Sequence, residues 1–435
     1  MSGMAESDSR PLNVVCLATY FKGGDFLREC KSRGCQVFLV TKENTLAEHW
    51  PRESIDELIA VPNDASPALF IDLAAFISRQ FKIDRIVALE EFDVITAALM
   101  REHFCLPGLS SSRAKSFRDK LAMAVVASAA GVDVPAFVPL INPGEIRDFI
   151  TRVPPPWIIK PRSDVSAIGI RKVSGHEEVW RTVDELNARD SLRERASYYL
   201  LAQFIPGEVF HVDALVEDGK VTFAGANQYG RPPMEVAHQG GAYISHTIPH
   251  GSEDQRKLFE ANRGIVKALG LRRGATHAEF IKSREDGRFY FLEIAARVGG
   301  AYIAEVLEAA SGVNLWREWA RNEIENSDFP RGAGEEKGAA IESLVSGSTR
   351  QSAQRRLVPW RREYAGIILS LAKQESPDTS GYTDPEIVYR VKKRHHAGLI
   401  VKSKELTRVK DLLDQYAIRF AEDFSATLPP LEKAE

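Results

Sequence analysis

Two glutamates on either side of a short polar turn have the types and the spacing of a metal site. The apolar runs around Glu279 and Glu293 predict the two strands of a β-hairpin. If residues 285–287 form its loop, Arg284 faces Arg288 and the two glutamates lie opposite each other on one face. Such like charges repel unless a cation lies between them, and Mg²⁺ prefers these hard oxygen ligands. A two-residue loop would put the carboxylates on opposite faces, so an ordinary solvated hairpin stays the alternative.

A second candidate segment has the character of a phosphate-binding loop. An apolar strand ends in Lys160, and a polar loop of small residues runs from Arg162 through Ser166 to Gly169. Backbone N–H groups of small residues can approach phosphate oxygens closely, and a lysine at the strand end adds a fixed positive charge. Taken alone, the segment is better explained as a surface hairpin with a solvent-reaching lysine.

A third segment is a strand interrupted by Pro206-Gly207. A break of this kind leaves backbone groups unpaired, and they can hydrogen-bond the edge of an adenine ring. Phe204 and Ile205 would supply an apolar wall beside it. A merely bent strand is the default interpretation.

The elements that position these segments fall into three units. Residues 1–112 alternate short apolar strands with helices, which predicts an α/β unit with a parallel sheet. They contain no GxGxxG motif, so this unit is interpreted as a scaffold that contributes part of a substrate site. A second unit extends from residue 113 to 328, and a predicted helix over 112–130 marks its beginning. Its short β-branched runs predict antiparallel sheet, with 157–225 as a smaller lobe.

The third unit follows a stretch rich in glycine, proline and charge. This stretch, residues 327–339, marks a boundary before an α+β tail at 335–435, and the tail ends in an amphipathic helix over 404–420. The predicted fold class is therefore mixed, α/β followed by α+β.

Composition excludes several kinds of protein. The chain has 57 basic and 60 acidic residues and a net charge of −3, so nucleic acid is not an expected partner. No apolar signal core or bilayer-length apolar run is present, so a cytoplasmic protein without membrane contact is expected. The four cysteines include no CxxC pair, which disfavours disulfides and a thiolate metal site.

In this order, the three segments resemble the ATP-grasp superfamily of carboxylate-amine ligases, which includes D-alanine ligases, biotin carboxylase and amino-acid ligases. The resemblance covers the N-terminal unit and the core from about Arg113 to Gly312. It implies a Rossmann-like pre-ATP-grasp domain, an ATP-grasp fold and a small C-terminal α+β domain. It also implies ATP and Mg²⁺ as cofactors, with Mn²⁺ as an alternative metal.

The resemblance assigns roles residue by residue. The implied ATP-binding residues are Lys120, Lys160, Arg162, Ser166, Gly169, Gln203, Phe204, Ile205, Glu208 and His211. Glu279 and Glu293 match the two magnesium carboxylates, and the implied catalytic residues are Arg297, Lys160 and His277. The candidates for contacts with the substrate are Glu91, Arg231, Gly240, Gly241, Arg297 and Gly300.

The implied activity is phosphorylation of a carboxylate by ATP, followed by transfer of the acyl group to an amine. Small-molecule acids and amines are the expected partners, and a homodimer is compatible with this interpretation. Two alternatives stay open at this point. One is a carboxylase of the same superfamily that acts on bicarbonate, and the other is an ATP-binding regulatory protein without turnover.

Overall fold

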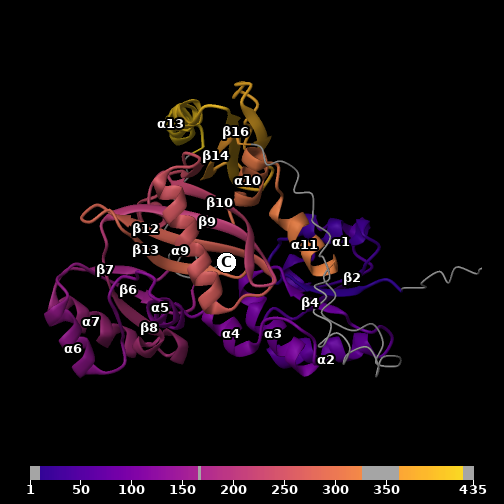
Figure 1. Ribbon diagram of the computed structural model, residues 1–435, viewed down its shortest axis with the longest axis horizontal. Coiled ribbons are helices and arrows are strands. Elements are labelled where there is room, and N and C mark those ends of the chain that lie inside the picture. Colours follow the sequence, from indigo (N-terminus) through magenta and orange to yellow (C-terminus); the bar gives the residue numbers. More distant parts are fainter. Residues whose placement is uncertain (1–9, 165–167, 326–361, 425–435) are drawn as a thin grey trace, which may run out of the picture.

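The computed structural model describes residues 10–164, 168–325 and 362–424. Figure 1 shows the N-terminal unit in indigo, a smaller lobe in purple and magenta, and a central sheet whose upper end consists of the C-terminal strands in yellow, next to the C-terminal helix. Within the described residues, no helix has both the length and the apolar composition that crossing a bilayer requires.

The N-terminal unit is a four-stranded parallel sheet flanked by helices, as the alternating pattern predicts. The strand order is β3-β2-β1-β4, and every side chain of β1 is buried because helices and the core cover the sheet. The elements are β1 (Asn13–Leu17), α1 (Gly24–Ser32), β2 (Gln36–Lys42), η1 (Glu43–Thr45), η2 (Arg52–Ser54), β3 (Glu57–Val61), α2 (Pro67–Ser78), β4 (Arg85–Ala88), η3 (Glu91–Asp93) and α3 (Val94–His103).

The entry to the core consists of two helices, α4 (Ser111–Ser116) and α5 (Lys120–Ala129), so the single helix predicted over 112–130 is wrong. The Asp119 carboxylate accepts hydrogen bonds from the backbone N–H groups of Leu121 and Ala122 at 3.0 and 3.4 Å. A capping residue needs an extended backbone, and this ends the first helix. The consequence is that Lys120 stands at the N-terminus of α5.

The smaller lobe is a four-stranded antiparallel sheet in the order β5-β8-β6-β7. Its own apolar core includes Trp157, Phe149 and Leu201. The elements are β5 (Phe137–Pro139), α6 (Pro143–Arg152), β6 (Trp157–Pro161), β7 (Arg171–Val173), α7 (His176–Asn187), η4 (Leu192–Glu194), η5 (Ala196–Tyr198) and β8 (Tyr199–Gln203). The next strand belongs to a different sheet, so the interrupted strand at Pro206-Gly207 is the hinge between the two.

The central sheet has eight strands in the order β13-β12-β9-β10-β11-β14-β16-β15, each antiparallel to its neighbours. Its strands are β9 (Gly207–Glu217), β10 (Lys220–Tyr229), β11 (Tyr243–Thr247), β12 (Gly274–Ser283), β13 (Phe289–Ala295), β14 (Tyr364–Leu371), β15 (Ile387–Arg390) and β16 (His396–Ser403). The helices are α8 (Pro233–Gln239), α9 (Glu253–Leu269), α10 (Ile303–Ser311), α11 (Leu315–Glu325) and α13 (Leu406–Asp423).

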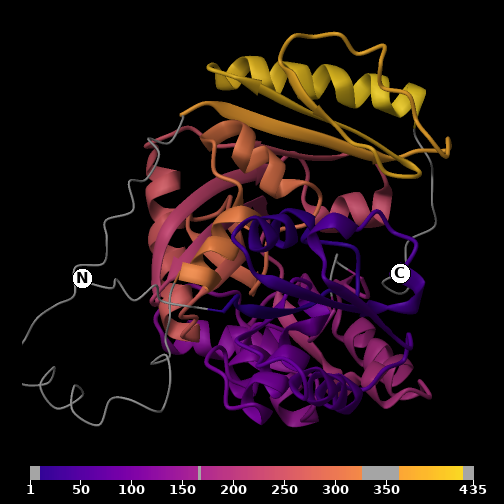
Figure 2. The same cartoon turned by 90° about the vertical axis from the view of Figure 1, so that its right-hand side faces the viewer.

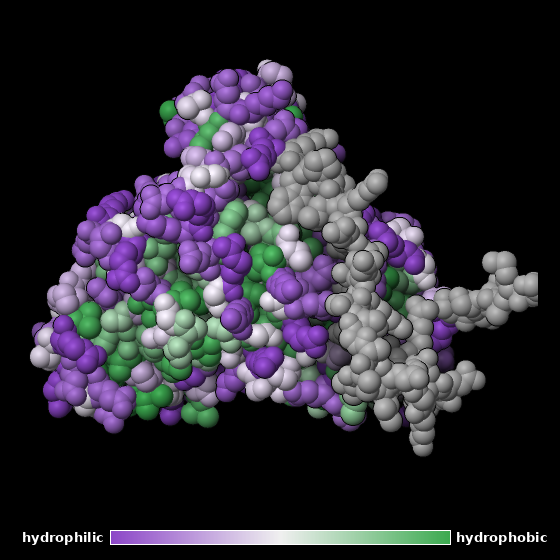
Figure 3. All heavy atoms as spheres, in the orientation of Figure 1, coloured by the Kyte–Doolittle hydropathy of each residue, from purple (hydrophilic) through white to green (hydrophobic). Residues whose placement is uncertain are grey.

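The C-terminal strands do not form a sheet of their own. Strand β14 pairs with β11, so the tail extends the core sheet, and α13 packs on it as the predicted amphipathic helix. Figure 2 shows this tail above the core, with the N-terminal unit in front. In Figure 3, hydrophilic side chains predominate over the tail, and hydrophobic ones are visible lower on the same face, near the smaller lobe. The predicted boundary at 327–339 lies outside the described residues.

The two faces of the central sheet have different partners. Along β9, Phe210, Val212 and Val216 pack against α5 and α9, whereas Leu215 packs toward α10, α11 and the N-terminal unit. Successive residues of a strand point to opposite faces, so the odd-numbered residues of β9 face the N-terminal unit. We call this the inner face and the other the outer face.

The hairpin of β12 and β13 places Glu279 opposite Glu293, which confirms the predicted arrangement. The expected turn is wrong, however, because Ser283 rather than Arg284 faces Arg288: the Ser283 N–H donates to the Arg288 carbonyl at 2.9 Å. A bulge between the turn and the glutamates, at Leu292, then shifts the register by one residue. The one-residue difference in the turn and the one-residue bulge compensate each other, so the Glu279 and Glu293 carboxylates share a face.

Candidate active site

Two lysines and two glutamates form the centre of the candidate site. The Lys120 Nζ lies 3.0 Å from the Glu293 Oε2 and also donates to the Asp164 carbonyl at 2.5 Å. Lys160 enters from β6 of the smaller lobe. Burial lowers the pKa of Lys160 to about 8, with a further lowering by Lys120, although Glu293 and Glu279 oppose this change. Both lobes therefore contribute charged groups to one space.

The segment that precedes α5 holds the beginning of the predicted phosphate loop. The Asp119 carboxylate accepts two hydrogen bonds from the Arg162 guanidinium, at 3.0 and 2.5 Å. The Arg118 Nη2 donates to the Ser163 carbonyl at 3.0 Å, and the Lys120 N–H donates to the Arg162 carbonyl at 2.7 Å. Arg162 is thus engaged by protein, and its predicted contact with ATP stays a prediction.

The remainder of the loop is described only in part. Ser166, a predicted ATP ligand, lies outside the described residues. Gly169 has φ +70°, a left-handed conformation that glycine adopts without steric cost, and it returns the chain into β7. The predicted contact of Gly169 with phosphate stays a prediction.

The hinge between the sheets contains Phe204 and Ile205, the residues predicted to form an apolar wall beside the adenine ring. The Gln203 N–H donates to the Ala136 carbonyl at 2.8 Å, so this residue still belongs to the smaller lobe. Lys172 stands 3.9 Å above the centroid of the Phe204 ring, and Ile205 is buried. An aromatic ring and an aliphatic side chain thus line the hinge, which is consistent with an apolar wall.

Glu208, expected near the ribose, is on the other side of the sheet. In the ladder between β9 and β12, Glu208 lies opposite Lys282. The Lys282 Nζ donates to both carboxylate oxygens of Asp254 on α9, at 2.7 and 2.8 Å. Glu279 pairs with His211 on the inner face. Because residues opposite each other in a ladder share a face, Glu208 points away from Glu279, and the structure does not bring it together with the two predicted metal carboxylates.

Arg297 is held by a carboxylate of the N-terminal unit. The Arg297 Nη2 lies 2.5 Å from the Glu91 Oε2, and the other oxygen of Glu91 is bonded by the Arg118 Nη1. Burial raises the pKa of Glu91, but Arg297 and then Arg118 outweigh it and lower the pKa to about 2. The buried Arg297 Nε has no partner among the described residues.

Neither Arg118 nor Lys22, which forms a 2.6 Å ion pair with the buried Glu90, was singled out from the sequence. Both make contacts to residues far along the chain, and a single sequence carries no signal of such pairs. The position of Arg118 two residues before Lys120 was the one available hint. Together with Glu91 and Arg297, these residues make the junction between the N-terminal unit and the core strongly charged.

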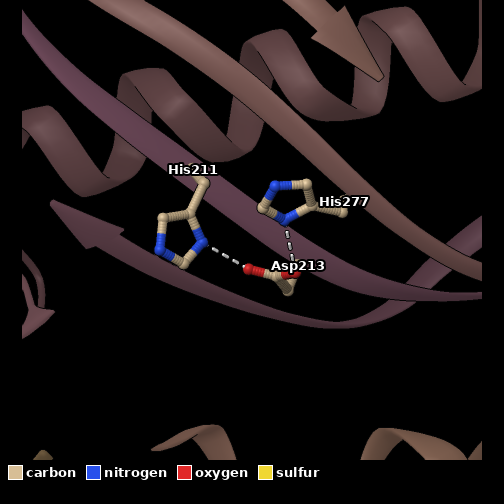
Figure 4. A group of neighbouring side chains, drawn as sticks. All are labelled: His211, Asp213 and His277. Carbon is tan, nitrogen blue, oxygen red and sulfur yellow. Dashed lines mark hydrogen bonds and ion pairs between the residues drawn. The ribbon is translucent and has the colours of Figure 1, made fainter. Parts of the chain in front are cut away.

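The two predicted histidines, His211 and His277, contact one aspartate, Asp213 (Figure 4). The His277 Nδ1 lies 2.8 Å from the Asp213 Oδ1, and its Nε2 lies 3.4 Å from the Glu279 Oε1. Burial lowers the pKa of His277, but Asp213 and Glu279 outweigh it and raise the pKa to about 10. His211 is fully buried, with both ring nitrogens bonded to protein, so it presents no free nitrogen to ATP.

The remaining substrate candidates divide into two groups. Arg231 and Gly241 line a cavity of about 590 Å³ together with Lys410 and Asp414 of α13. Gly240 is next to it, and its carbonyl accepts from the Arg231 Nη1 at 3.3 Å. The cavity also includes outer-face residues of the central sheet, so these candidates are not brought together with Arg297. Gly300, in contrast, follows Arg297 in the same loop.

Comparisons with known proteins agree with this geometry. Residues 153–305 match the model of the ATP-grasp domain family. The chain is 24% identical over 276 residues to an L-arginine-specific L-amino acid ligase of Bacillus subtilis, which covers 62% of this chain and 64% of that protein. The chain thus spans less than two thirds of that relative.

Solved structures share the fold over nearly the whole chain. An L-amino acid ligase from Bacillus licheniformis superposes with a TM-score of 0.69 at 16% identity, covering 94% of this chain and 97% of that one. The biotin carboxylase domain of a 2-oxoglutarate carboxylase from Hydrogenobacter thermophilus gives 0.66 at 18% identity, with 94% and 90% covered. Residues 153–305 thus match the ATP-grasp domain family, and the chain as a whole shares the fold of these solved ligase and carboxylase structures.

Proposed function

We propose that the protein is an ATP-dependent carboxylate-amine ligase. It phosphorylates a carboxylate with ATP and transfers the acyl group to an amine, releasing ADP and phosphate. The observation that carries the proposal is the meeting of four charged side chains from both lobes, Lys120, Lys160, Glu279 and Glu293, next to an arginine with an unpartnered buried donor. Such a site fits a polyphosphate bound with a divalent cation beside an acyl oxyanion.

The two glutamates fit Mg²⁺ by chemistry and by placement. Their oxygens are hard ligands that share one face, and a protein donor holds one oxygen of each: the Tyr229 hydroxyl donates to the Glu279 Oε1 at 2.7 Å, and Lys120 holds the Glu293 Oε2. The second oxygen of each carboxylate is left for a metal. Mg²⁺, or Mn²⁺ in its place, would neutralise the charge that develops on the transferred phosphoryl group.

In the proposed reaction, a carboxylate oxygen of the substrate attacks the γ-phosphorus of ATP, and the bond to the β-phosphate oxygen breaks to release ADP. Lys120 and Lys160 hold phosphate oxygens. The amine nitrogen then attacks the carbonyl carbon of the acyl phosphate, phosphate leaves with the bonding electron pair, and the nitrogen gives up a proton. Arg297 stabilises the tetrahedral oxyanion between these steps. The hinge residues Phe204 and Ile205 flank the adenine.

The proposed substrate class is α-amino acids, since a curated relative acts on one by its name. Purified protein should be incubated with ATP, Mg²⁺ and pairs of amino acids that include arginine, and ADP and products measured by coupled assay and mass spectrometry. Amino-acid-dependent ADP release with a new amide is expected. ADP release that only bicarbonate stimulates, or ATP binding without turnover, would refute the proposal.

A further inference from the structure

A continuous chain of polar contacts extends behind Glu279 on the inner face. The Ser245 Oγ lies 2.8 Å from the His211 Nε2, and the His211 Nδ1 lies 2.6 Å from the Asp213 Oδ2. The other oxygen of Asp213 meets the His277 Nδ1 at 2.8 Å, and the His277 Nε2 reaches the Glu279 Oε1. All four residues behind Glu279 are at most 9% exposed. Figure 4 shows Asp213 between the two imidazoles.

Asp213 is the residue that fixes the direction of this chain. Its side chain is fully buried and, as a carboxylate, only accepts hydrogen bonds, so each imidazole presents an Nδ1–H to it. His211 is then locked with its Nε2 toward Ser245, and His277 is locked with its Nε2 toward Glu279. Unpaired buried carboxylates are costly, so both imidazoles are held firmly in place.

The consequence for Glu279 is a fixed orientation. Its Oε1 is next to two donors of the protein, the Tyr229 hydroxyl at 2.7 Å and the His277 Nε2 at 3.4 Å. Tyr229 and His277 come from different strands, so the position of Oε1 is fixed from two sides, while Glu293 is the ladder partner of Glu279 on the same face. Residues that orient a metal-binding group in this way are commonly worth about 10- to 100-fold in metal affinity.

The same pair of residues supports the loop that carries Arg297. A Cβ atom placed on Gly299 would lie 2.8 Å from the Asp213 Oδ1 and 3.0 Å from the His277 Nδ1. The backbone of this loop therefore packs directly on the aspartate and the imidazole. A displacement of Asp213 would move the metal-binding carboxylate and the arginine loop together.

We propose that Asp213 is a positioning residue, which acts through His277 to aim Glu279 at the divalent cation and to seat the Arg297 loop. This inference rests on the proposed function, because it takes Glu279 as a metal ligand. The side chains of His211, Asp213 and His277 are themselves of metal-binding types. Each Nδ1, however, is engaged by a different oxygen of Asp213 at hydrogen-bond length, so the group acts as an internal support.

The test is Asp213→Asn, which keeps the shape of the side chain and removes its charge and one acceptor. Binding of Mn²⁺ to the full-length protein with saturating ADP is measured by electron paramagnetic resonance, and binding of ADP without metal by calorimetry. We expect Mn²⁺ affinity about tenfold weaker, a changed Mn²⁺ line shape, and metal-free ADP affinity within about twofold of the parent. A general loss of packing would weaken both Mn²⁺ binding and metal-free ADP binding.

Thr276→Val is the matched control. Thr276 is the strand neighbour of His277, is fully buried and points to the outer face, and its hydroxyl has no partner within the described part of the chain. Parental Mn²⁺ affinity is expected for it. If Asp213→Asn does not fold, Gly299→Ala replaces it, since the added methyl group presses on Asp213 from outside; severalfold weaker Mn²⁺ binding is then expected.

The outcomes separate this inference from the proposed function. Parental Mn²⁺ affinity in Asp213→Asn, or in Gly299→Ala where that variant decides, overturns the role of Asp213 while the ligase proposal stands. A parent that binds no Mn²⁺ in the presence of ADP refutes the metal site, and the role of Asp213 with it.

Discussion

Nucleotide binding is expected to weaken as the pH rises above 8, because Lys160 loses its charge there. Burial is the largest reason why the pKa of this lysine falls from 10.5 to about 8, and the neighbouring Lys120 adds to it. With that pKa, Lys160 is about nine-tenths charged at pH 7 and about one-tenth charged at pH 9. If only the charged form holds a phosphate oxygen, the dissociation constant for ADP rises about tenfold over this interval.

The assay is calorimetry of metal-free ADP binding at pH 7, 8 and 9. At pH 8, titrations in buffers of different ionisation enthalpy should report uptake of about half a proton per ADP, since bound phosphate restores the charge of Lys160. Protons are taken up rather than released because the pKa of Lys160 is lowered in the free protein. Above pH 8 the Lys160 amine of the free protein is mostly deprotonated, whereas in the complex with ADP it holds the proton.

Two variants isolate the effect of this one lysine. Lys160→Met should bind ADP more weakly at pH 7, and its dissociation constant should no longer rise about tenfold between pH 7 and 9. Any change caused by titration of ADP itself affects the parent and the variants equally. Lys267→Met, on an exposed position of α9, should behave as the parent. An equal pH dependence in the parent and in Lys160→Met would refute the assignment of Lys160 to the phosphate site.

Three further substitutions test other parts of the structure. Glu293→Gln should lower ADP release in the ligase assay at least about 100-fold, because it removes a charge from the metal site. Arg118→Met should lower the free energy of unfolding in urea by about 3 kcal/mol, because it leaves one oxygen of the buried Glu91 unpaired. Gly207→Ala should cost about 2 kcal/mol in the same measurement, because its Cβ would lie 2.1 Å from the Lys282 carbonyl oxygen.

Each of these expectations has a matching control or a contrary result. Unchanged turnover in Glu293→Gln, with an unchanged melting temperature, would remove the metal assignment. Arg113→Met, at an exposed arginine of α4, should change the free energy of unfolding by less than about 0.5 kcal/mol. Gly381→Ala should do likewise, since no atom lies within 4 Å of its Cβ position. Equal costs in Gly207→Ala and Gly381→Ala would argue against the close approach.

Local patterns were sufficient to predict most of the architecture. Alternating apolar strands and helices predicted the parallel sheet, and the polar turn between two apolar runs placed Glu279 opposite Glu293 although the turn itself differs. The continuous helix over 112–130 was wrong because periodicity does not register a capping side chain such as Asp119. The ladder put Glu208 on the outer face because a residue's face depends on the pairing that follows the Pro206-Gly207 break.

Contacts between distant segments were beyond the reach of one sequence. Glu91 contacts Arg118 and Arg297, which lie in two other segments of the chain, and Asp213 contacts His277 across 64 positions. Each of these residue types is common on protein surfaces, so neither type nor local spacing indicates a buried partner. Such pairs depend on sheet order and on how the units pack, which are set by the whole fold.

The pairing of β14 with β11 makes the C-terminal segment a completion of the central sheet. A chain cut after residue 325 would leave the backbone of β11 with an open row of donors and acceptors, next to apolar side chains such as Ile244 that α13 normally covers. Such a fragment would associate with other chains through that edge. Attempts to isolate the half that contains the proposed nucleotide site should therefore retain residues 362–424, even though they supply no proposed ligand to ATP.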